Sequence, residues 1–148
     1  DLFSSAPTRL IVCGAGDAIA KLSSVNDWKL ATESKKEFEA PYDPYYAREL
    51  KSNAHLILND IRQMQKTGLL IGGDAGSYQK FVNDVWYVSQ RNGQIGGKIG
   101  STRPISGSEH LYGHAIDWLY ESRGKENPYL PYQTSTAVLF YHLSSTQS

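Results

Sequence analysis

One short segment of the chain carries the residue types that could do chemistry. It runs from Ser106 to Trp118 and places a histidine, His110, seven positions before an aspartate, Asp117. Neutral imidazole and carboxylate groups suit Zn²⁺, which they bind at about 2.0–2.2 Å. Gly113, between them, lets the chain fold back so that both side chains face one point. The spacing predicts a zinc site, with a hydrogen-bonded His–Asp pair in a capped turn as the alternative.

Other polar side chains near this segment have more than one interpretation. Ser108 carries a loop hydroxyl that could cap an element or contact a substrate. Together with Glu109 it does not complete a nucleophile, base and orienting group. His142 is the only histidine downstream of the segment, and it is either a buried, hydrogen-bonded core residue or a further metal ligand.

Two helices are predicted in the middle of the chain. The first runs over residues 44–66, because apolar residues recur there at helical spacing and Asp43 can cap its start. The second runs over residues 77–92 and ends at Gly93. The glycine-rich stretch that follows, residues 93–107, predicts a flexible connection.

Short apolar runs predict the strands. They cover residues 69–71, 115–119 and 137–143. The expected fold is therefore α+β: a small antiparallel sheet that carries the metal site, with two helices packed on one side. Residues 1–24 are expected to form an N-terminal extension and residues 25–148 the domain itself.

The pattern Ser108-x-His110-x-x-Gly113-x-Ala115-x-Asp117 resembles the zinc-binding signature of the D-alanyl-D-alanine peptidase family. That family includes D,D-carboxypeptidases, D,D-dipeptidases and L-alanyl-D-glutamate endolysins. The similarity covers roughly residues 25–118. It implies that His110, Asp117 and His142 bind Zn²⁺ and leave a fourth position open for water. The implied activity is that of a zinc metallopeptidase, a carboxypeptidase or endopeptidase that hydrolyses a peptide bond in the stem peptide of bacterial peptidoglycan.

Two positions depart from the family pattern. Leu139 stands where the family has its general base, and Asp74 stands where it has an arginine that grips the substrate carboxylate. Either Glu121 or Glu126 then supplies the base and Arg103, with Ser108, contacts the substrate, or the domain is catalytically degenerate. A degenerate domain would keep the fold, with or without the metal, and bind the cell wall or serve a structural role.

Composition excludes several other classes. Fifteen Lys and Arg balance fifteen Asp and Glu, so the basic footprint of a nucleic-acid binder is absent. One cysteine rules out an internal disulfide framework. No run approaches the roughly 20 apolar residues of a membrane span. Ten tyrosines leave open a metal-free module that binds a partner through its tyrosine-rich surface. We expect a monomer, either outside the cytoplasm in the periplasm or cell wall, or acting as a phage lysis protein, with no signal visible.

Overall fold

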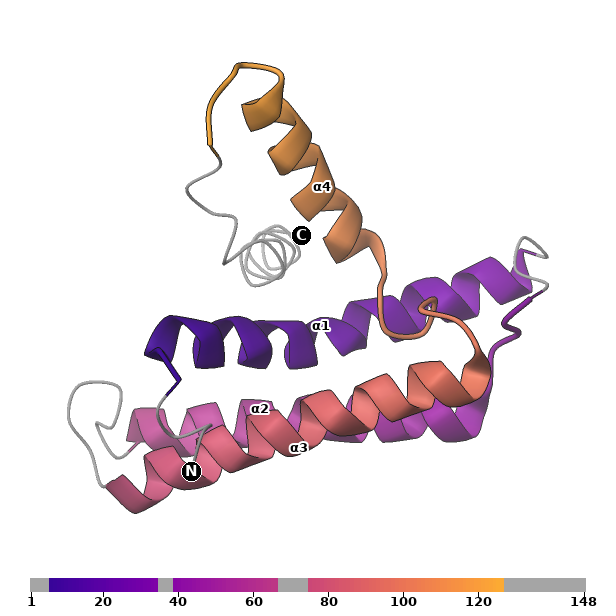
Figure 1. The fold of residues 1–148 in the computed structure, drawn as a ribbon. Coiled ribbons are helices and arrows are strands. Elements are labelled where there is room, and N and C mark those ends of the chain that lie inside the picture. Colours follow the sequence, from indigo (N-terminus) through magenta and orange to yellow (C-terminus); the bar gives the residue numbers. More distant parts are fainter. Residues whose placement is uncertain (1–5, 35–38, 67–74, 127–148) are drawn as a thin grey trace.

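Four α-helices make up the part of the chain that the structure describes. The computed structural model describes residues 6–34, 39–66 and 75–126. The helices are α1 (Thr8–Glu33), α2 (Pro44–Lys66), α3 (Ala75–Ile99) and α4 (Ser108–Glu121). Figure 1 shows α1, α2 and α3 lying alongside one another as a bundle, while α4 leaves the bundle from α1 as a separate arm. None of the described helices is long and apolar enough to cross a membrane.

The predicted α+β fold is wrong, because the described ranges contain helices and no strand. Residues 115–119, predicted as a strand, lie inside α4. A short apolar run fits a buried strand and a helix equally well, so its periodicity could not decide. The predicted strands at 69–71 and 137–143 lie outside the described residues. The predicted domain boundary after residue 24 falls inside α1.

The helix predicted over residues 44–66 is confirmed as α2. Its N-terminus is capped as expected: Oδ1 of Asp43 accepts the backbone N–H of Tyr45 at 2.7 Å. The helix that begins near residue 77 does not end at Gly93 but continues to Ile99. Ile95 is fully buried against α1 and α2, and this burial offsets the cost of the neighbouring glycines in a helix.

Two clusters of buried apolar side chains hold the three-helix bundle together. One lies toward the start of α1 and the other toward its end. Trp28 is the largest fully buried side chain, and its indole N–H donates to the carbonyl oxygen of Ala40 at 2.6 Å. Gly14 allows α1 and α3 to approach closely, because a Cβ there would lie 2.9 Å from a methyl group of Val85. Trp86, in contrast, is 44% exposed.

Candidate functional site

One face of α1 carries a row of polar side chains that meets the chain segment 104–110. Asp17, Lys21, Ser24 and Asp27 follow one another at spacings of three or four residues, which places them along a single helix face. Lys21 is 2% exposed, and its ammonium group donates to Oδ1 of Asp17 at 2.7 Å. A lysine is rarely this buried without a partner, so the ion pair with Asp17 is what allows Lys21 to be buried.

The segment before α4 is hydrogen-bonded to this face. The hydroxyl of Ser24 donates to the carbonyl oxygen of Pro104 at 3.0 Å, and Oδ2 of Asp27 accepts the backbone N–H of Ser108 at 2.7 Å. Gly107 sits so close to α1 that a Cβ would lie 2.7 Å from both the Asp27 carboxylate and the Ser24 backbone. Only glycine fits there without displacing the segment.

Glu109, in the first turn of α4, is a buried carboxylate with three contacts. Its Oε1 accepts the backbone N–H of Gly107 at 2.9 Å and lies 3.1 Å from Nδ1 of His110, and its Oε2 accepts the hydroxyl of Ser23 at 3.1 Å. Burial alone raises the pKa of Glu109, but the hydrogen bonds with His110, Gly107 and Ser23 outweigh it and leave the pKa below its ordinary value. Glu109 is therefore held as a carboxylate.

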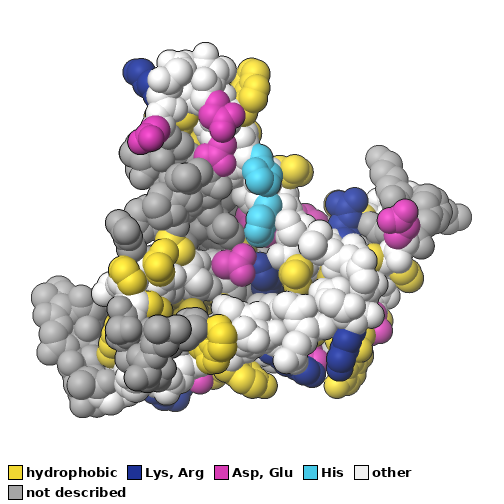
Figure 2. All heavy atoms as spheres, viewed as in Figure 1, with side chains coloured by type: hydrophobic (Ala, Val, Ile, Leu, Met, Phe, Trp, Pro, Cys, Tyr) yellow, Lys and Arg dark blue, Asp and Glu magenta, His cyan; other side chains and the backbone are white. Residues whose placement is uncertain are grey.

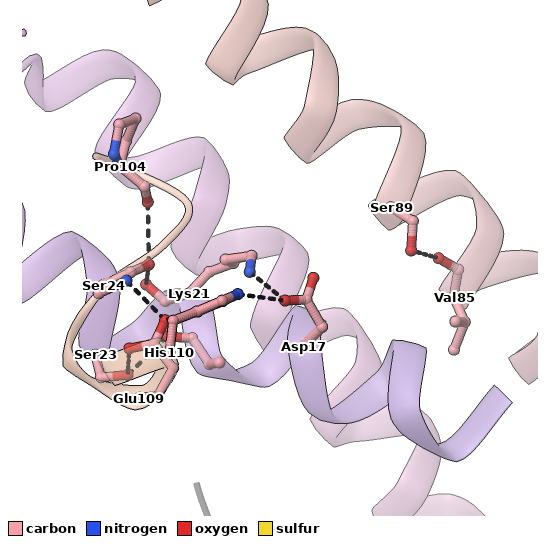
Figure 3. Close-up of polar contacts among 11 residues, drawn as sticks. Asp17, Lys21, Ser23, Ser24, Val85, Ser89, Pro104, Glu109 and His110 are labelled. Carbon is pink, nitrogen blue, oxygen red and sulfur yellow. Dashed lines mark hydrogen bonds and ion pairs between the residues drawn. The ribbon is translucent and has the colours of Figure 1, made fainter. Parts of the chain in front are cut away.

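His110 projects from α4 toward the ion pair on α1. Figure 3 shows its ring pointing toward the Asp17 carboxylate. Its Nε2 lies 3.9 Å from Oδ1 of Asp17, which is too long for a hydrogen bond. Figure 2 shows imidazole side chains beside an acidic and a basic side chain where the α4 arm meets the bundle. The arrangement sets a nitrogen and a carboxylate oxygen facing one another, with the Lys21 ammonium beside them.

The structure places the predicted metal ligands differently from the expectation. His110 and Asp117 both lie on α4, two helical turns and roughly 10 Å of axial rise apart, so the structure does not bring them together. His110 instead faces Asp17. Among the described residues, no three His, Cys, Asp or Glu side chains form a group that could hold a metal ion. His142 lies outside these residues, so its role stays a prediction.

The predicted catalytic and substrate-binding residues are spread along α4 and its approach. Ser108 begins the helix and is tied to α1 through its backbone. Arg103 lies in the exposed turn before the helix. Glu121 and Glu126 lie exposed at the other end of α4, the former roughly 20 Å along the helix axis from Ser108. The structure therefore does not bring either glutamate to the His110 end.

Sequence reasoning missed Asp17, Lys21 and Ser23, and it gave Glu109 no role of its own. A signal was available once residues 8–33 are taken as one helix. Polar side chains then recur at 17, 21, 24 and 27 on one face, between alanines and valines that pack into the bundle. Nothing in the spacing alone pairs that face with a histidine near residue 110.

Comparison with known proteins finds dehydrogenases. No family model matches the chain. The glycerol-1-phosphate dehydrogenase [NAD(P)+] of Sulfolobus acidocaldarius is 35% identical over 124 residues, which are 84% of this chain and 32% of that enzyme. The enzyme of the same name from Hyperthermus butylicus is 38% identical over 117 residues, 79% of this chain and 30% of the relative. For Pyrococcus furiosus the values are 34% over 120 residues, 81% and 31%. The chain thus spans about a third of the length of these relatives.

These matches overturn the resemblance to zinc D-alanyl-D-alanine peptidases. The relatives are named as oxidoreductases, so the predicted zinc metallopeptidase activity and the peptidoglycan stem peptide as substrate are wrong. The alternative, a degenerate cell-wall-binding or structural domain, has no support either. The physical reason lies in the spacing: seven residues are two turns of a helix, so His110 and Asp117 share a helix face but lie too far apart to bind one metal ion.

Proposed function

We propose that this protein is an NAD(P)-dependent dehydrogenase that oxidises glycerol-1-phosphate. The observation that carries the proposal is the 31–38% identity, over 79–84% of this chain, with enzymes of that name. In such a reaction, a hydride passes from the alcohol carbon to the nicotinamide ring, and the hydroxyl proton must leave as the ketone forms. The protein has to orient the alcohol and accept or stabilise that proton.

The described helices carry residues that suit binding of the alcohol substrate better than binding of the dinucleotide. Gly14 and Gly16 lie inside α1, so they do not form a phosphate-binding loop between a strand and a helix. Within the described ranges, the place where imidazole, carboxylate and ammonium groups meet is the junction of α1 and α4. That junction, with His110 and Asp17 at its centre, is the site we assign to the alcohol.

A zinc ion at this junction is part of the proposal. Asp17 offers a carboxylate oxygen and His110 an imidazole nitrogen, which are both zinc ligands. Two ligands about 2.1 Å from one tetrahedral ion lie roughly 3.4 Å apart, close to the 3.9 Å between the two atoms here. The donor types and their separation therefore fit, while a third ligand has to come from outside the described residues, where His142 is the candidate in this sequence. When bound, zinc would polarise the alcohol oxygen and ease loss of its proton.

A chimaeric enzyme tests the proposed activity. The segment of this chain that matches the Sulfolobus acidocaldarius enzyme replaces its counterpart there, and formation of reduced nicotinamide is followed with glycerol-1-phosphate. We expect turnover with this substrate, little with its mirror image glycerol-3-phosphate, and a loss of about 100-fold or more in His110→Ala. His55→Ala, an exposed histidine on α2, is the control and should leave turnover unchanged.

Folding of the chimaera is checked by helix content, and binding of NADP⁺ is measured separately. A chimaera that folds and binds NADP⁺ but does not oxidise glycerol-1-phosphate overturns the proposal. Equal activity in wild type and His110→Ala would keep the enzyme class but remove the α1–α4 junction as its site.

A further inference from the structure

The contacts of Glu109 constrain where the proton of the His110 ring sits. Glu109 is 4% exposed, and its Oε1 lies 3.1 Å from Nδ1 of His110. A carboxylate can only accept hydrogen bonds. If Nδ1 carried a lone pair, two acceptors would face one another at hydrogen-bonding distance inside the protein, which is unfavourable. The contact is satisfied when Nδ1 carries the proton and donates it to Glu109.

The other nitrogen of the ring has no matching acceptor within reach. Nε2 of His110 is 3.9 Å from Oδ1 of Asp17, beyond the range of a hydrogen bond. That oxygen already accepts a proton from the ammonium group of Lys21 at 2.7 Å. The charged groups that face the ring are therefore Glu109 on the Nδ1 side, and Asp17 with Lys21 on the Nε2 side (Figure 3).

We propose that Glu109 is a positioning residue that fixes the neutral ring of His110 in the tautomer with its proton on Nδ1, and thereby directs a bare Nε2 lone pair toward Asp17. Glu109 does not touch the reacting atoms in this scheme. It acts through the histidine, as carboxylates do when they orient an imidazole by a hydrogen bond to its second nitrogen.

The hydrogen bonds of Glu109 help to hold its carboxylate in place beside the His110 ring. The backbone N–H of Gly107 donates to Oε1 at 2.9 Å. The Ser23 hydroxyl lies 3.1 Å from Oε2 and 2.7 Å from the carbonyl oxygen of Ala20, so the two acceptors share its proton. Both carboxylate oxygens therefore have a partner besides the histidine. Ser23 lies on α1, six residues after the start of the polar row at Asp17. Helix α1 therefore carries both the hydroxyl that contacts Glu109 and the aspartate toward which Nε2 of His110 points.

The tautomer itself does not depend on the proposed dehydrogenase activity; only its use in binding an ion or an alcohol rests on that proposal. A lone pair on Nε2 can bind a cation or accept the proton of a hydroxyl group, whereas an Nε2–H could do neither. Glu109, one position before His110 on α4, thus determines whether Nε2 of His110 can bind a cation or accept a proton at this junction.

The test is ¹⁵N NMR of the imidazole nitrogens in the full chain labelled with [¹⁵N]histidine, without metal or substrate, at a pH where the histidines are neutral. His110→Asn assigns the signals among the four histidines. The Nδ1–H form of His110 should exceed the Nε2–H form by about tenfold or more, because a hydrogen bond to a charged group shifts such an equilibrium by that much. Wild type with the proton on Nε2 overturns the proposal without any further variant.

Variants at Glu109 separate positioning from simple folding. Glu109→Met removes the acceptor and should lower the tautomer ratio about tenfold. Glu109→Gln keeps an oxygen that can face Gly107 and His110 and should restore the ratio. Glu121→Met, at the exposed end of the same helix, is the matched control and should change nothing. An unchanged ratio in Glu109→Met, with helix content intact, also overturns the proposal. Since no turnover is measured, failure of the dehydrogenase assay is a separate result.

Discussion

Lys21 donates to Asp17 at 2.7 Å across one turn of α1, yet the two side chains differ in exposure, with 3% of the lysine and 40% of the aspartate open to solvent. Water can replace the lysine as a partner for Asp17. It cannot replace the aspartate as a partner for Lys21 without opening the helix interface. The two halves of the pair therefore contribute unequally to folding.

This inequality can be measured by urea unfolding. Asp17→Asn leaves the Lys21 ammonium buried beside a weaker acceptor and should lower the free energy of unfolding by about 1–3 kcal/mol. Lys21→Met removes the buried charge, keeps the volume and should change stability by less than about 1 kcal/mol. A larger loss of stability in Lys21→Met than in Asp17→Asn would show that the lysine is hydrated in solution.

Zinc binding distinguishes between two candidate aspartate ligands. The proposed site uses Asp17, whereas the sequence spacing predicts Asp117. Zinc titration followed by calorimetry should show a loss of about 10–100-fold or more in affinity for Asp17→Asn. Asp117→Asn, two turns away from His110 on α4, should bind as wild type does. A loss in Asp117→Asn with none in Asp17→Asn would favour the ligand set that the spacing predicted.

Glu109 should make stability depend on pH in the acid range. Its pKa in the folded protein is lowered from an ordinary value near 4.5, so the unfolded chain binds the proton more tightly. The stabilisation is present above that ordinary value and is lost as the pH falls through the lower, folded pKa. Glu109→Gln should lose this part of the pH dependence between neutral and acid pH, measured by urea unfolding. Glu121→Gln should keep the wild-type slope.

Gly107 and Gly97 form a matched pair of glycines. A Cβ at Gly107 would lie 2.7 Å from the Ser24 backbone and from two carboxylates, so Gly107→Ala should cost about 1–3 kcal/mol. A Cβ at Gly97, inside α3, meets nothing within 4 Å, and Gly97→Ala should stabilise the protein by about 0.5–1 kcal/mol. Thermal unfolding reports both, and equal effects would mean that residue 107 does not sit against α1 in solution.

The sequence predicted well where one local rule was sufficient. The capping aspartate Asp43, proline at the first position and a regular apolar stripe fixed both ends of α2. The sequence-based prediction failed where a tertiary contact overrides a local rule. Gly93 has the features of a helix end, but α3 continues to Ile99 because Ile95 is buried in the bundle. Four of the residues 115–119 are apolar and one of these, Ile116, is β-branched, yet they extend α4 because the helix has already been started at Ser108.

The site was predicted only in part, because local spacing identifies residues within one segment and not their partners from distant segments. His110 was singled out from its neighbours in the chain, and the structure does place it beside polar partners. Its partner Asp17 could not be found from spacing, because the contact is made only after α1 and the start of α4 come together. Asp117 satisfied the spacing but not the distance, since a helix separates residues seven positions apart by two full turns.

Three hydrogen bonds that join α1 to residues 104–109 connect positions 80, 81 and 86 residues apart. Burial of Ile95 against Val25 and Trp28 already holds the end of α3 beside α1, so the loop that these bonds close has on the order of ten residues. Closing a loop of that length costs chain entropy of roughly 2 kcal/mol, which is more than a single hydrogen bond, worth about 0.5–1.5 kcal/mol net, can supply. The three bonds therefore depend on one another, and they bring His110 to Asp17 only when the three-helix bundle is already packed.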